Sequence, residues 1–234
     1  MTITATGLTK AAGAAAVVAG SIFIAIQIGH PSTGSFTTET TQWVVRGCAK
    51  IVMVALALAG ITGMYLRQYR KAGLLGLIGY LMFAAGYLAL FSVEVIAAAV
   101  LPNLVHSQPG FVNDVVAAAN GGTPNGDIGG LQTLFNFAGG GYILGGLLFG
   151  VALFRTRVLA RWAAALLAVS TVATAALAVL PESFNRPLAV PEGIALIALG
   201  VSLWRNAGDS RQASPETSAE TGPAVSPVAQ PAVR

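Results

Sequence analysis

The side chains of this sequence that could do chemistry are ionisable and amide groups placed within long apolar runs. Six of them are candidates for lining a polar pocket: Arg46, Lys50, Glu94, Gln132, Asn136 and Glu192. Charged groups inside a membrane are costly, and where they occur they commonly mark a binding site or an ion pathway. These residues therefore point to non-covalent binding of a small polar molecule.

Spacing suggests which of these charges could meet. Arg46 and Lys50 are four residues apart, so they share one face of a helix. Counted from the basic turn that follows, Arg46 lies 21 residues before Arg67, or about 31 Å along a helix. Glu94 lies 22 residues after Ala72, or about 33 Å. We therefore predict an Arg46–Glu94 pair, with Lys50 about one turn below it. The alternative is that all three charges independently reach water at the membrane surface.

The amide residues show a similar pattern. Gln132 and Asn136 are four residues apart on another run, and Gln27 and Glu192 fall at a similar depth. If these faces converge, they line a polar pocket that is open to the outside. The alternative is that they form hydrogen bonds between helices, which are worth about 0.6–2 kcal/mol each in a membrane.

Composition places the chain in a membrane. It has 234 residues, of which 55% are apolar and 9% are charged, whereas soluble domains carry about 25% charged residues. The net charge is +4, but the basic residues sit at the ends of apolar runs, so nucleic-acid binding has no support. Cys48 is the only cysteine, which excludes an intrachain disulfide and a cysteine-based metal cluster.

Six apolar runs predict an all-α, polytopic transmembrane bundle. A spanning helix needs about 20 apolar residues, and runs of this length suit helices better than barrel strands. The predicted spans are Ala11–Ile28, Val44–Leu66, Ala72–Leu101, Leu131–Phe154, Trp162–Leu180 and Leu188–Trp204. We expect residues 1–205 to form this domain and residues 206–234, which are rich in Pro, Ala, Ser, Thr and Glu, to form a disordered cytoplasmic tail.

Charge distribution between the runs predicts the orientation. Most basic residues outside the runs fall on one side of the predicted membrane: Lys10, Arg67, Arg70, Lys71, Arg155, Arg157, Arg161, Arg205 and Arg211. The opposite loops carry Glu39, Asp114, Asp127 and Glu182. Cytoplasmic loops are enriched in Lys and Arg, so we expect both termini in the cytoplasm. The first run has about 18 apolar residues and no small-residue cleavage site after it, and we expect it to be retained.

Two further segments have distinct patterns. The loop 102–130 is predicted to face outward and to contain a short helix at Phe111–Ala119, and it is either functional or a plain connector. The fourth run contains small residues four apart, Gly141 with Gly145 and Gly146 with Gly150, which allow close helix packing. A broken helix at a binding site is the alternative interpretation of these glycines.

No motif indicates an enzyme. The sequence contains no nucleophile elbow, no His-Glu-x-x-His zinc motif and no phosphate-binding loop. His30 and His106 are the only histidines, and a zinc or haem site would normally have further recognisable ligands. We therefore predict no catalytic residue, no metal site and no cofactor.

The turns carry a resemblance. The segment 67–76, RQYRKAGLLG, is followed by Leu101-Pro102 and later by the segment 159–164, LARWAA. Over roughly residues 10–205 the chain resembles small multi-pass membrane proteins of actinobacteria that have no assigned function. The resemblance implies a six-helix fold in a bacterial plasma membrane and supplies no catalytic residues.

Two functions remain open from the sequence. The first is small-molecule transport or ligand binding through the outward-facing polar pocket. The second is a structural or interaction subunit of a membrane complex, with no ligand of its own. The expected partners are the lipid bilayer and either a small molecule or another subunit, which could be a second copy of this chain.

The predicted orientation can be tested by cysteine labelling. In a Cys48→Ser background, Asn125→Cys should react with a membrane-impermeant maleimide on intact cells, because loop Lys and Arg residues cluster on the opposite side. A cysteine at Lys71 should react only after permeabilisation. Reversed labelling of the two positions would show that the orientation is wrong.

Overall fold

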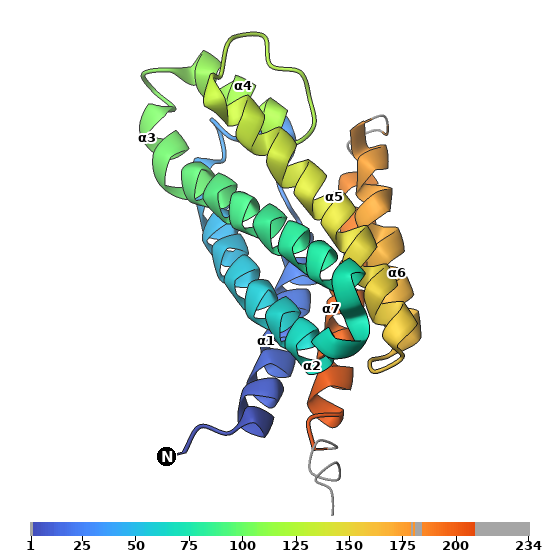
Figure 1. Ribbon diagram of the computed structural model, residues 1–234. Helices are drawn as coiled ribbons and strands as arrows, with labels where there is room; N and C mark the ends of the chain where they lie inside the picture. The colour runs from blue at the N-terminus through green and yellow to red at the C-terminus, as the bar shows by residue number, and fades with distance from the viewer. Residues whose placement is uncertain (1, 179, 181–183, 209–234) are drawn as a thin grey trace, which may run out of the picture.

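The structure, a computed structural model, describes residues 2–178, 180 and 184–208, and these form an all-helical bundle (Figure 1). Residues 209–234 of the predicted tail, which include Arg211, lie outside the described residues. Glu182 also lies outside them. Within the described part, Ala207 is 1% exposed and the Asn206 carbonyl accepts a hydrogen bond from Arg67. Packing on the bundle therefore continues past the expected domain end at residue 205.

Long apolar helices dominate the described chain. By length and composition, four segments could cross a membrane: Ala5–Ala25, Thr40–Leu104, Gly130–Thr156 and Arg186–Arg205. They comprise α1 (Ala5–Ala25), α2 (Thr40–Val95), α5 (Gly130–Thr156) and α7 (Asn185–Arg205). Helix α6 (Arg161–Ala173) is shorter and is prolonged by a 3-10 turn, Thr174–Ala178.

Helix α2 is folded back on itself and supplies two of the six predicted spans. Its backbone leaves the helical conformation at Gln68 and at Gly73, where φ is +58°, a value that glycine adopts without strain. The two arms, residues 40–67 and 74–95, lie side by side in Figure 1. Tyr65 stacks on Tyr80 across them with ring centroids 4.5 Å apart. The fold therefore has the six helices that the sequence predicts.

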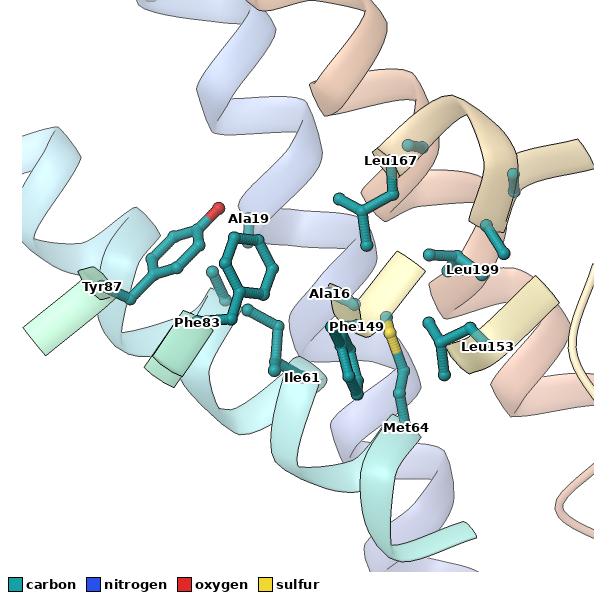
Figure 2. Packing of buried hydrophobic residues seen from close by; sticks show 14 of the residues in the cluster. Ala16, Ala19, Ile61, Met64, Phe83, Tyr87, Phe149, Leu153, Leu167 and Leu199 are labelled. Carbon is teal, nitrogen blue, oxygen red and sulfur yellow. The ribbon is translucent and has the colours of Figure 1, made fainter. Parts of the chain in front are cut away.

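The helices close into a ring. Helix α1 packs between α7 and the first arm of α2, the second arm packs on α5, and α6 lies between α5 and α7. The start of α1 and the end of α7 lie at the same end of the bundle (Figure 1). The side of the membrane on which this end lies remains a prediction. Figure 2 shows the interior, where Ile61, Met64, Phe83, Phe149 and Leu153 interdigitate.

Glycines let the helix backbones approach closely. A Cβ on Gly145 would collide with the backbone of Phe83, and one on Gly141 would lie 3.0 Å from the Gly86 Cα. A Cβ on Gly150 would lie 2.8 Å from the backbone nitrogen of Ala168 on α6. The glycine pattern of the fourth run therefore serves packing, and α5 is continuous through it.

The loop between the second arm and α5 forms a packed cap. It begins with a π-helical segment, Ile96–Val100, followed by α3 (Leu101–Leu104) and α4 (Pro109–Ala119). Helix α4 confirms the predicted Phe111–Ala119 helix. Its buried residues join a second small core with Phe36, Trp43 and Phe135. The Asp114 carboxylate accepts hydrogen bonds from two backbone N–H groups, those of Asn125 and Gly126. The segment is therefore more than a plain connector.

Close packing at Gly145 generates a stability prediction. Gly145→Ala should lower the free energy of unfolding by about 1–3 kcal/mol, because the added methyl group would push α5 away from the second arm. Gly140→Ala is the matched control on the same helix, because nothing lies within 4 Å of its Cβ position. Thermal unfolding in detergent would measure both. Equal stability of the two variants would show that the close contact is not needed.

Candidate ligand-binding cavity

A cavity of about 550 Å³ lies inside the end of the bundle that carries α4. Its walls come from α1, both arms of α2, α5, the 3-10 turn after α6, and α7. Residues 118–121, at the end of α4, also line it and connect it to the cap. Apolar side chains such as Phe23, Leu90 and Ile143 form much of the wall.

An ion pair lies on the cavity wall. The Lys50 Nζ and a Glu94 carboxylate oxygen are 3.2 Å apart, and the two side chains are 21% and 16% exposed. Both residues line the cavity. The predicted Arg46–Glu94 pair is therefore wrong, because Lys50 is the partner of Glu94. Lys50 and Glu94 are therefore not independent charges.

Arg46 has a different role. Its guanidinium donates to three carbonyls beyond the last turn of α1, those of Ile26 at 2.7 Å, Ile28 at 3.1 Å and Gly29 at 2.8 Å. The last carbonyls of a helix have no partner within it, and a cation near them is favoured by the helix dipole. Arg46 therefore fastens the end of α1 to α2 and does not line the cavity.

Amide side chains complete the polar part of the wall. Gln27, Asn120 and Asn136 line the cavity, whereas Gln132 does not. Gln132 donates from its Nε2 to the Asn136 Oδ1 at 3.1 Å, so it orients the amide that faces the cavity. Of the six predicted residues, three line the cavity, Lys50, Glu94 and Asn136, and three do not, Arg46, Gln132 and Glu192. Arg186 also lines the cavity, and neither it nor Asn120 was among the predicted residues.

Glu192 lies deeper than the cavity wall. It is 1% exposed, and its Oε1 accepts a hydrogen bond from the Tyr87 hydroxyl at 3.0 Å. Its Oε2 has no hydrogen-bond partner among the residues that the structure describes. Tyr87 itself lines the cavity and thus connects it to the carboxyl group. Sequence reasoning missed Tyr87 because a tyrosine in an apolar run looks like any other aromatic core residue.

His30 lies just outside the bundle, beyond the end of α1. Burial lowers its pKa to about 4, opposed by a hydrogen bond with the Pro31 carbonyl and assisted by the positive charges of Arg186, Lys50 and Arg46. The ring is therefore neutral at pH 7, and it packs edge-on against Trp43 with ring centroids 4.9 Å apart. His106 is exposed in the cap. In the described part of the chain, no three His, Cys, Asp or Glu residues form a group that could hold a metal ion.

Comparison of the chain with protein-family models, with curated proteins and with solved structures finds no match. The functional argument consequently rests on the residues of the cavity and on the fold that positions them.

The Lys50–Glu94 pair can be tested by a double-mutant cycle. Lys50→Gln and Glu94→Gln should each destabilise the protein, because each leaves a partly buried charge without its partner. The double variant should lose less than the sum, with a coupling energy of about 1–3 kcal/mol. Arg46→Gln combined with Glu94→Gln is the control and should be additive. Additivity in both cycles would contradict the assigned pair.

Proposed function

We propose that this chain is a multi-pass protein of a bacterial plasma membrane that binds a small molecule in the cavity beneath α4. The main support is the placement of the Lys50–Glu94 pair on the wall of that cavity. Withdrawing two charges from water costs several kcal/mol per ion, and their mutual attraction often fails to offset it. A binding role accounts for retaining them there, because the same groups can bind a polar ligand.

The cavity suggests the class of ligand. Its volume of about 550 Å³ falls within the range of about 300–1,000 Å³ typical of small-molecule sites. Lys50 supplies donors, Glu94 supplies acceptors, and the Asn136 amide supplies both. The rest of the wall is largely apolar, including Phe23 and Leu90. We infer an amphipathic ligand with a zwitterionic or strongly hydrogen-bonding head and an apolar body.

The packing of the bundle favours a cavity that opens toward one end only. Away from α4, the interior is filled by Met64, Phe149, Leu153 and their neighbours (Figure 2). Combined with the charge distribution of the loops, this arrangement supports a ligand site on the outer side of the membrane. Binding is the step for which the cavity provides support, and passage across the membrane would require the core to separate.

The ligand class can be tested by stabilisation of the purified chain in detergent. The probes are three straight-chain amphiphiles of equal length, with a zwitterionic amino-acid head, a carboxylate head and an ammonium head. The zwitterion should raise the unfolding temperature most. A ligand that binds only the folded state contributes about 2.7 kcal/mol at 100 times its dissociation constant.

A matched pair of variants assigns the effect to the cavity. Asn136→Ala should raise the apparent dissociation constant of the zwitterionic probe about 5- to 10-fold, because one hydrogen bond contributes about 1 kcal/mol. Asn103→Ala, in α3 and outside the cavity lining, is the matched control and should keep the affinity. Stabilisation by none of the three probes, or equally in both variants, would instead favour a structural subunit.

A further inference from the structure

Glu192 is a carboxyl group buried in the N-terminal half of a helix that can cross a membrane. It belongs to the segment Arg186–Arg205 and is 1% exposed. Its Oε1 accepts a hydrogen bond from the Tyr87 hydroxyl. An ionised carboxylate can accept hydrogen bonds at about four lone-pair positions, so a single donor satisfies it poorly. Burying a charge in this condition is strongly unfavourable.

The helices of the bundle carry the following other polar and ionisable groups. On α2, Lys50 is paired with Glu94 at 3.2 Å, and on α5 the Tyr142 ring packs against Tyr87 with centroids 5.8 Å apart. Arg186 lies six residues before Glu192 on α7, or roughly 9 Å along the helix axis. On α6, Thr171 donates to the carbonyl of Leu167 in its own helix. Lys10, the one basic residue of α1, is in the second turn of that helix, at the end away from the cavity.

We propose that Glu192 is a proton-binding site inside the membrane, and that Tyr87 connects this site to the cavity. A bound proton makes the carboxyl group neutral and removes the cost of a buried charge. It also places a hydroxyl on one oxygen while the other still accepts from Tyr87. This role needs no ligand in the cavity, so it stands apart from the proposed binding function.

Tyr87 provides the route by which the proton reaches water. Figure 2 shows its ring beside Phe83, with the hydroxyl directed away from its own helix into the bundle. The same residue lines the cavity. For release, the carboxyl proton lies on Oε1 and the Tyr87 hydroxyl turns to donate to water in the cavity, so that the Tyr87 oxygen accepts from Oε1. The carboxyl O–H bond then breaks and the proton passes to the Tyr87 oxygen. The hydroxyl gives its own proton to a water molecule in the cavity. Glu192 is left as a carboxylate, Tyr87 is unchanged, and the water becomes hydronium.

Infrared difference spectroscopy of the full chain in nanodiscs tests the proposal. Between neutral and alkaline pH, the wild-type protein should lose the carbonyl stretch of a protonated carboxyl group and gain the antisymmetric stretch of a carboxylate. Glu192→Gln should abolish this change. Glu94→Gln is the matched control and should keep it, because Glu94 belongs to the separate ion pair with Lys50 and its replacement leaves Glu192 and Tyr87 in place. A wild-type spectrum without the band, or a band that survives in Glu192→Gln, would overturn the proposal.

Tyr87→Phe gives a second variant that keeps the carboxyl group itself. It should shift the frequency of the same band, because the hydrogen bond from Tyr87 is lost. It should also slow the proton exchange that follows a pH jump. This variant carries the test if Glu192→Gln does not fold. A frequency and an exchange rate equal to those of the wild type would show that Tyr87 does not connect Glu192 to water.

The pH dependence of stability provides an independent measurement. If Glu192 holds a proton in the folded state and loses it on unfolding, the folded state binds one more proton near neutral pH. Stability must then fall as pH rises, by up to tenfold in the unfolding equilibrium per pH unit. Glu192→Gln should remove this slope, and Glu94→Gln should retain it. A stabilisation by sodium ions without this slope would identify a cation site and overturn the proton assignment.

Discussion

Close approach of helix backbones at small residues is the contact on which the whole bundle depends. Between α1 and α7, a Cβ on Gly13 would lie 2.8 Å from the Gly200 carbonyl oxygen, and a Cβ on Gly20 would lie 2.5 Å from that of Gly193. Lipid tails are as apolar as leucine, so helices in a membrane gain stability from packing, not from escape from water. These contacts close the ring of helices and thereby determine which side chains face inward.

The ring is filled unevenly, and this produces the cavity. Large side chains such as Phe83 and Phe149 occupy the middle. Toward α4, α5 presents Gly139 and Gly140 to the interior, and both line the cavity. The cap with its own small core lies over this end. A tightly packed half thus holds the helices together, while the half beneath the cap has room for a ligand.

Four charged or ionisable side chains inside the bundle or at its edge are stabilised in three different ways. Lys50 and Glu94 compensate each other as an ion pair on the cavity wall. Arg46 donates to backbone carbonyls at the end of α1 that lack partners within the helix. These hydrogen bonds stabilise both the charged guanidinium and the helix terminus. Glu192 accepts a hydrogen bond from Tyr87, and its second oxygen has no hydrogen-bond partner among the described residues. This difference separates Glu192 from the other three side chains and supports the proposal that it binds a proton.

The sequence alone determined the helices, because the relevant physics is local. The length of an apolar run predicts a helix from the residues of that run alone. The glycine at the turn of α2 and the short apolar segment of α4 are likewise local features of the sequence. Depth along a helix was predictable only to about one turn, because counting residues put Arg46 level with Glu94, whereas Lys50, one turn lower, is its partner. Only the tertiary structure decided that Glu94 pairs with Lys50 and that Tyr87 contacts Glu192. A partner depends on how far each helix is shifted along its neighbour and on how it is rotated about its axis, and both are set by packing between segments far apart in the chain.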